Sequence, residues 1–204
     1  MGDPSSTMPA VADSEIRNPK SKIRNPPAGH LVLGIDPGTA ITGYGLVRGE
    51  GEALVLVEYG TVTTPAGEPL AARLVMLYRG LLEIIAQHRP DAVAVEELFF
   101  AQNTRTALAV GQARGVVLLA AANAGLPVHE YTPLRVKQAL TGYGRAAKAQ
   151  VQQMVRWLLH LDQIPQPDDA ADALAVAICH LRATQVSLLL RESGKRAIRE
   201  SGLC

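Results

Sequence analysis

Three aspartates lie close together ahead of an apolar run. Asp168, Asp169 and Asp172 stand in the segment QPDDAADALAV, residues 166–176. Asp is a favoured N-cap, and acids in a first helical turn are stabilised by the helix dipole, so capping explains one or two of them. Asp172 lies one turn further in and on the same helix face, where like charges repel unless a positive group lies between them. Taken alone, the segment leaves both helix capping and metal binding open.

Two further carboxylates end predicted strands. Asp36 follows the apolar run of residues 31–35 and precedes Pro37 and Gly38, and Glu96 follows an apolar run that begins near residue 91. An Asx turn is the plainer interpretation of Asp36. For Glu96, burial would cost several kcal/mol unless the carboxylate is paired or bound to a metal.

These acids can meet if their strands are neighbours in one sheet. A helix that packs on that sheet, with its N-terminus at the same end, would add Asp169 and Asp172 to Asp36 and Glu96. Crowded carboxylates repel, and a hard divalent cation relieves that repulsion. Oxygen ligands without His or Cys spacing favour Mg²⁺ or Mn²⁺ over Zn²⁺. Two such ions would activate a water and stabilise the leaving oxygen in phosphodiester hydrolysis.

The elements that must position the acids follow from apolar periodicity. Strands are predicted over residues 31–35, 41–47, 53–64, 91–97 and 127–131. Helices are predicted over about 70–89, 104–123, 133–140, 147–160 and 168–182. Three consecutive strands followed by alternating helices and strands predict an α/β fold. Its mixed five-stranded sheet would be flanked by helices, with an antiparallel hairpin at one side.

Composition indicates one cytoplasmic domain. The 204 residues are 48% hydrophobic and 4% aromatic, which predicts an aliphatic core, and we expect neither a secretory signal nor a membrane span. Cys179 and Cys204 form no metal or disulfide pattern. We expect residues 1–29 to be a disordered arm, 30–183 the folded domain and 184–204 a flexible tail.

The near-neutral net charge of +1 hides a basic middle. Residues 101–161 carry seven basic residues against Glu130 alone, whereas the flanking regions are acidic. Such a layout suits an acidic cation site beside a polyanion-binding surface, although scattered solvated helix faces would give the same count. Among these cations, Arg145 and Lys148 lie in or directly after the Gly-rich loop TGYGRAAK, which would allow close approach to a phosphate.

Four segments carry a resemblance to a known family. These are GIDPGTAITGYGLV, VAVEELFFAQNTRTALAVGQARGVVLLAAANAGLPVHEY, RVKQALTGYGRAAKAQVQQMV and DDAADALAVAICH. They closely resemble the RuvC family of Holliday-junction resolvases, and the resemblance covers roughly residues 31–182. It implies a ribonuclease H-like fold and a homodimeric, Mg²⁺-dependent endonuclease that nicks two opposed strands of a four-way junction. It also implies two Mg²⁺ ions per subunit, with Mn²⁺ as a substitute, and a partnership with the RuvA–RuvB branch-migration complex.

The resemblance also assigns residues. The family's catalytic, metal-binding acids match Asp36, Glu96, Asp169 and Asp172, and we take Asp168 as the helix cap. Lys148 matches a functional lysine that we count with the catalytic residues. The expected DNA contacts are Phe99, Arg105, Lys137, Arg145 and Lys148. A core role for Phe99 remains an alternative.

Three other functions fit this sequence less well. The actin and sugar-kinase superfamily shares the Asp-x-Gly-Thr hairpin, but its two nucleotide-binding halves exceed 204 residues. A related ribonuclease H-like nuclease that processes RNA lacks the ELFFAQN…GQARG segment. A non-catalytic junction-binding protein would not need all four acids.

Overall fold

The computed structural model describes residues 29–97 and 104–200, with side chains over 29–97 and 107–187. Its five strands form one sheet in the order β3-β2-β1-β4-β5. Antiparallel pairing joins β1 to β2 and β2 to β3, and parallel pairing joins β1 to β4 and β4 to β5. The predicted mixed five-stranded sheet with a hairpin at one side is therefore confirmed. The strands are β1 His30–Asp36, β2 Ile41–Glu50, β3 Ala53–Thr63, β4 Ala92–Glu96 and β5 Val128–Tyr131.

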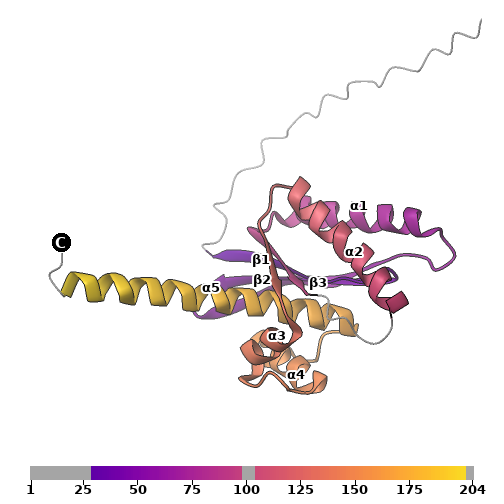
Figure 1. The fold of residues 1–204 in the computed structure, drawn as a ribbon. Helices are drawn as coiled ribbons and strands as arrows, with labels where there is room; N and C mark the ends of the chain where they lie inside the picture. The colour runs from indigo at the N-terminus through magenta and orange to yellow at the C-terminus, as the bar shows by residue number, and fades with distance from the viewer. Residues whose placement is uncertain (1–28, 98–103, 201–204) are drawn as a thin grey trace, which may run out of the picture.

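Five helices accompany the strands over the described residues. They are α1 Leu70–His88, α2 Thr104–Asn123, α3 Pro133–Thr141, α4 Lys148–Leu158 and α5 Asp168–Glu200. Thr132 caps α3 as its sequence predicts, since its hydroxyl accepts from the backbone N–H of Arg135 at 3.2 Å. The predicted end of the last helix near Arg182 was wrong: α5 continues to Glu200 as one helix, past the sheet (Figure 1). The division into arm, domain and tail remains a prediction, and residues 1–28 lie outside the described part.

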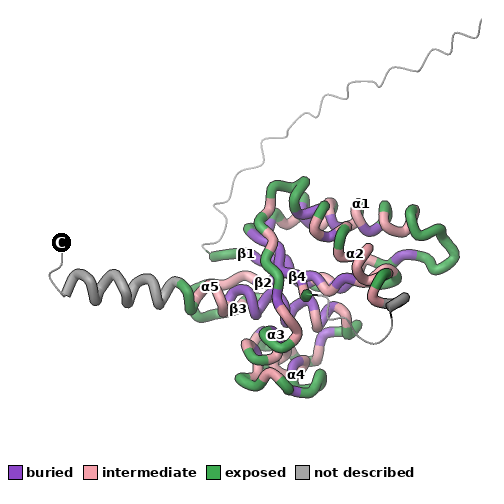
Figure 2. Tube along the Cα trace, viewed as in Figure 1, coloured by how far each residue is buried: buried purple, intermediate pink, exposed green. Residues whose placement is uncertain are grey.

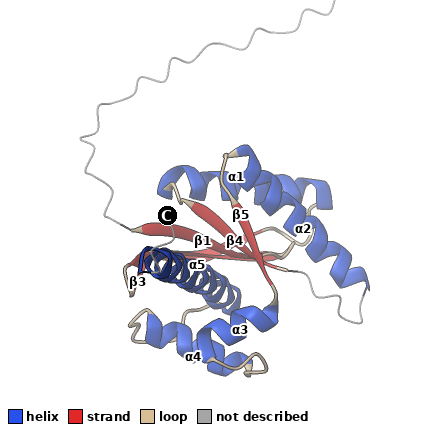
Figure 3. Ribbon diagram, turned by 60° about the vertical axis from the view of Figure 1, so that its left-hand side comes forward, coloured by secondary structure: helices blue, strands red, loops and turns tan. Residues whose placement is uncertain are grey.

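The helices cover the two faces of the sheet in two layers. Figure 3 shows α1 and α2 on one side and α5, α3 and α4 on the other. Buried stretches of the chain concentrate where each layer meets the strands (Figure 2). The two clusters of buried residues include Leu33, Val93 and Leu77 on the α1 side and Val32, Ala94 and Leu174 on the α5 side. Strands β1 and β4 are buried on both faces, which explains their unbroken apolar runs. None of the described helices has the length and apolar character needed to cross a lipid bilayer.

Glycines let α5 lie directly against β1 and β2. A β-carbon on Gly34 would overlap the carbonyl of Ala173, and one on Gly43 would overlap the carbonyl of Asp169. Strand alternation places Gly43 and Gly45 on the face that α5 covers. Because β2 carries no side chain at these points, the first turns of α5 come to rest beside the end of β1.

Gly43→Ala tests this close approach. The added methyl group can be accommodated only by moving the backbone of α5, so we expect destabilisation of about 1–3 kcal/mol. Because Asp169 lies on the displaced turn, the nuclease activity that the family resemblance implies should fall together with stability. Denaturant unfolding and a cleavage assay measure the two effects, and Gly67→Ala is the control, because nothing lies within 4 Å of a β-carbon there. Equal stability and activity of the two variants would contradict the account.

Candidate active site at the ends of β1 and β4

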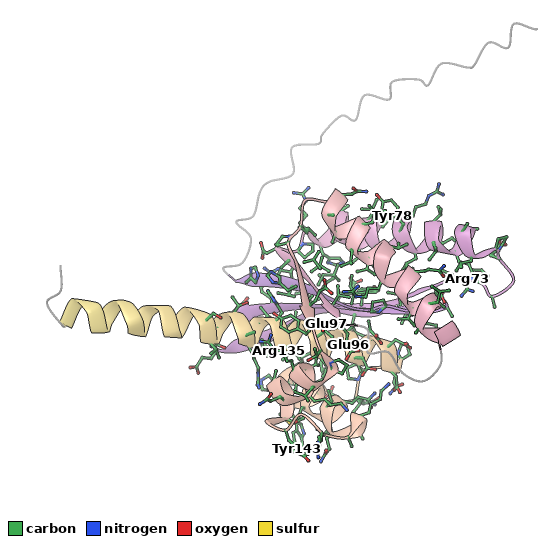
Figure 4. All side chains as sticks on the ribbon, in the orientation of Figure 1. Arg73, Tyr78, Glu96, Glu97, Arg135 and Tyr143 are labelled. Atoms are coloured by element: carbon green, nitrogen blue, oxygen red, sulfur yellow. The ribbon has the colours of Figure 1, made fainter. Side chains whose placement is uncertain are left out.

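The register of β1 and β4 brings two carboxylates together. Ile35 pairs with Val95 in parallel, so Asp36 and Glu96, one residue further along each strand, lie side by side at the same edge. Each is partly buried, whereas Glu97 is exposed, as strand alternation predicts. Figure 4 labels Glu96 and Glu97 beside the helices of the α5 layer. The condition under which the two acids can meet, adjacent strands in one sheet, is therefore fulfilled.

Helix α5 supplies the other two acids. Asp169 lies in its first turn, against Gly43 of β2, which is the register partner of Asp36. One turn later, Asp172 helps to line a pocket of about 190 Å³ together with Glu96, Lys137 and Lys148. Strand ends and a helix start thus direct all four acids toward one region, although they lie far apart in the sequence.

The acids perturb one another. Burial raises the pKa of Asp36 to about 7, and the negative charges of Glu96, Asp172 and Asp169 add to this rise. Burial, followed by the charge of Asp172, also raises the pKa of Glu96. With this pKa, the neutral and the ionised forms of Asp36 are both populated near physiological pH. A site that raises the pKa of a buried carboxyl in this way favours a bound cation.

Lys148 forms ion pairs with two of the aspartates. Its ammonium lies 2.9 Å from the carboxylate of Asp172 and 3.2 Å from that of Asp168. Partial burial lowers the pKa of Lys148, but the two aspartates outweigh this effect and the net change is upward. Burial still raises the pKa of Asp172 despite the ion pair. Lys137, in the same pocket, also lowers the pKa of Glu96, but two ammonium groups do not neutralise four carboxylates, so the region keeps an excess of negative charge.

The two neighbouring aspartates differ in surroundings. Asp168 is the first residue of α5, its side chain is 56% exposed, and Lys148 and Gln152 lower its pKa. The predicted capping bond of Asp168 is not among the hydrogen bonds of the described residues. Asp169 is only partly exposed, and its charge acts on both Asp36 and Asp172. Asp168 also acts on Asp172, whereas of the two only Asp169 acts on Asp36, so the choice of Asp169 as the member of the acidic group stays a prediction.

The donor set fits a hard divalent cation. All four side chains offer carboxylate oxygens, the ligands that Mg²⁺ and Mn²⁺ prefer. Within residues 29–97 and 107–187, however, no three His, Cys, Asp or Glu side chains are already spaced as a metal site. Asp172 and the neighbouring Asp168 are instead paired with Lys148. The four acids therefore fit a divalent cation in their donor atoms and in their location, and their side chains would have to rotate to coordinate it.

The predicted DNA contacts are placed unevenly. Lys137 lines the acidic pocket from α3, and Arg145 is exposed in the loop between α3 and α4. Phe99 lies outside the described residues, as does the side chain of Arg105. Lys148, expected beside the DNA backbone, contacts the acids instead, so its role toward phosphate remains a prediction.

Sequence reasoning missed the glycines that allow α5 to approach the strands. The alternation of Gly43 and Gly45 in TGYGLV was the available signal, since residues two apart share one face of a strand. It also missed Arg73, whose side chain reaches the loop after Asp36. No sequence pattern linked Arg73 to that loop.

The fold and the site define the class. The sheet is mixed and five-stranded, two adjacent strands end in acids, and a helix that begins with acids packs across them. This arrangement is that of a ribonuclease H-like nuclease.

The family model for "Crossover junction endodeoxyribonuclease RuvC" matches residues 32–180. A protein of that name from Desulfitobacterium hafniense is 62% identical over 164 residues, which cover 80% of this chain and 98% of the relative. Another, from Pelotomaculum thermopropionicum, is 63% identical over 150 residues, 74% of this chain and 92% of the relative.

Solved structures agree. T. thermophilus RuvC in complex with a Holliday junction substrate matches with a TM-score of 0.74 and 43% identity, over 78% of this chain and 96% of that one. The yeast mitochondrial Holliday junction resolvase matches with a TM-score of 0.58 over 78% of this chain and 80% of that one, and at 15% identity it supports the fold alone.

The chain belongs to the RuvC family of crossover junction endodeoxyribonucleases. The predicted family and the ribonuclease H-like fold are both confirmed. The predicted function of a Holliday-junction-resolving endonuclease is confirmed at the level of this family. The RNA-processing and non-catalytic alternatives are not favoured.

Proposed function

We propose that this chain resolves four-way DNA junctions by metal-dependent nicking of two opposed strands, with Asp36, Glu96, Asp169 and Asp172 as the metal-binding acids. The observation that carries the proposal is the convergence of these four carboxylates. Burial raises the pKa of Asp36 to about 7, and the charges of the other three acids add to this rise. Folding such a group of acids has a cost that a capping or packing role does not explain. A bound cation does explain it.

The four acids would hold Mg²⁺, two ions per subunit, with Mn²⁺ as a substitute. When bound, such ions activate a water and stabilise the leaving oxygen of a phosphodiester. Lys137 and Lys148, which line the same pocket, would bind the phosphate that is cut or the one beside it. Arg145 and Arg105, with Phe99, would extend the contact along the DNA. Charge attraction from the basic middle of the chain would bring the junction to the acids.

Symmetric cutting needs two sites. We propose a homodimer in which each subunit cuts one of two opposed strands, and a link to the RuvA–RuvB branch-migration complex, both from family membership. The long helix α2 is a candidate for the dimer contact, since a β-carbon at Gly115 would meet open space and a second helix could approach there. We further propose that residues 30–183 act as the nuclease domain and that residues 1–29 are dispensable for its fold.

A titration of the protein with Mn²⁺, without DNA, tests the metal site. Asp36 carries a proton below its pKa of about 7, so metal binding at pH 6 must expel that proton, whereas at pH 8.5 the group is already ionised. We expect about one more proton released per subunit at pH 6 than at pH 8.5, and weaker apparent affinity at pH 6. Calorimetry in two buffers of different ionisation enthalpy counts the protons.

Asp36→Asn is the variant for comparison, and it should lose both the pH-dependent proton release and most of the affinity. Asp162→Asn, an exposed acid outside the site, should behave as the unaltered chain. Saturation at two ions per subunit supports the proposed stoichiometry. Binding that is independent of pH and indifferent to Asp36 would contradict the assignment.

A further inference from the structure

The loop between β1 and β2 begins directly after Asp36. It spans Pro37 to Ala40, and its backbone carbonyls are bound from outside the turn. The hydroxyl of Thr42, a fully buried residue, donates to the carbonyl of Gly38 at 2.6 Å and accepts from its N–H at 3.2 Å. The next two carbonyls are bound by Thr64, whose hydroxyl donates to Thr39 at 2.5 Å and whose backbone N–H donates to Ala40 at 3.0 Å.

Arg73, from helix α1 on the face of the sheet opposite α5, also binds this loop. It lies in the first turn of α1 (Figure 4), and its Nη2 donates to the carbonyl of Thr39 at 2.9 Å. Its Nε donates to the hydroxyl of Thr64 at 2.8 Å. Two atoms of one guanidinium thus bind the loop and the residue that holds the loop, and the fixed fork of the arginine sets their relative position.

These contacts lie where catalysis demands precision. The end of β1 is paired with β2 and β4, and on the α5 side Gly43, the register partner of Asp36, lies directly against Asp169. Three other acids repel the carboxylate of Asp36 electrostatically, so its position depends on how firmly the backbone after it is fixed. Charge-assisted hydrogen bonds of the Arg73 type are among the stronger polar contacts available for that purpose.

We propose that Arg73 is a positioning residue for the active site. Together with Thr64 it holds the loop of residues 37–40, and through that loop it fixes the end of β1 and the carboxylate of Asp36. This inference rests on the proposed function, because it concerns the same metal-dependent cut. Arg73 does not touch the acids. It acts through the backbone that carries one of them.

The test compares Arg73→Ala, Arg73→Lys and Thr64→Val with Arg79→Ala, which removes an exposed arginine of the same helix. Single-turnover cleavage is measured with protein in excess, beside junction affinity, the Mg²⁺ concentration for half-maximal rate, and thermal stability. We expect Arg73→Ala to cut about 10–100-fold more slowly, as a small misplacement of reacting groups does. Its junction affinity should stay within about threefold, and its Mg²⁺ requirement should rise, because a displaced Asp36 holds the metal less well.

Arg73→Lys should recover part of the rate, since one ammonium can bind Thr39 but cannot form the fork. Thr64→Val keeps the shape and removes the hydroxyl, so it should share the slower rate and higher Mg²⁺ requirement, and it serves as the test if Arg73→Ala does not fold. Unchanged rate and Mg²⁺ requirement in the folded variants would overturn the inference. Weakened junction binding at an unchanged saturated rate would also overturn it, because Arg73 would then contact DNA directly.

The outcomes separate this inference from the function it rests on. If the unaltered chain does not cut junctions, the proposed function fails. If the unaltered chain cuts and the Arg73 and Thr64 variants cut equally well, only the positioning role fails.

Discussion

Asp36→Asn is expected to lower the rate of junction cleavage by roughly 10³-fold or more while leaving junction affinity largely intact. The amide keeps the shape of the side chain but removes the charge that would hold a divalent cation at the centre of the acidic group. Phosphate contacts from the basic residues do not depend on this carboxylate, so binding should survive. Single-turnover cleavage and a gel-shift titration in Ca²⁺ measure the two effects.

The same variant should be more stable than the unaltered chain when metal is removed at pH 8. The pKa of Asp36 is raised to about 7 in the folded protein from an ordinary value of 3.8, so the folded state binds the proton more tightly than the unfolded state does. The contribution of Asp36 to the free energy of unfolding therefore falls as pH rises from about 4 to 7. Above pH 7 the ionised carboxylate destabilises the folded state to its full extent. Asparagine carries no charge and avoids this destabilisation, so the variant should be more stable than the unaltered chain at pH 8 and nearly equal to it near pH 4.

Thermal melts in EDTA at pH 4 and pH 8 show this difference, with Asp162→Asn as the control for removing an exposed acid. Loss of stability in Asp36→Asn at pH 8 would mean that Asp36 has a structural task. Cutting at the normal rate by Asp36→Asn would remove Asp36 from the active site.

Asp169→Asn and Asp168→Asn are expected to separate sharply, although the two aspartates are adjacent. Asp169 acts electrostatically on Asp36 and Asp172 and lies against Gly43, so its loss should slow cleavage by about 10²–10³-fold. Asp168 is 56% exposed and contacts Lys148 from the outer side, so its loss should cost less than about tenfold. The two variants carry the same change of charge, which makes each the control for the other.

Cleavage rates at saturating Mg²⁺, together with the Mg²⁺ concentration for half-maximal rate, decide between the two aspartates. A large loss in Asp168→Asn and a small one in Asp169→Asn would reverse the assignment and make Asp168 the ligand. Equal large losses would mean that both carboxylates take part.

Strand ends and helix starts made most of the site predictable. Asp36 and Glu96 each end a continuous apolar run, and such runs predict strands buried on both faces, which lie in the centre of a sheet. The i, i+3 spacing of Asp169 and Asp172 predicts one helix face. Once β1 and β4 are neighbours, those local rules bring the four acids to one edge. The family resemblance gave the same residues independently.

What the sequence did not predict depends on contacts between distant elements. The ion pairs of Lys148 with Asp168 and Asp172 join the start of α4 to the start of α5, and nothing local to residue 148 indicates them. Arg73 reaches Thr39 across 34 positions of sequence, through the packing of α1 beside the hairpin. The length of α5 was underestimated because apolar periodicity weakens after Arg182, whereas the helix continues to Glu200.

The most direct test of the central claim is cleavage of a synthetic four-way junction beside a linear duplex of the same sequence, in Mg²⁺, in Mn²⁺ and in EDTA. The account predicts paired nicks at symmetric positions on opposed strands of the junction, in either metal, with the duplex spared and EDTA abolishing the reaction. Tight junction binding without any cut in either metal would contradict it, and so would nicking that persists in EDTA.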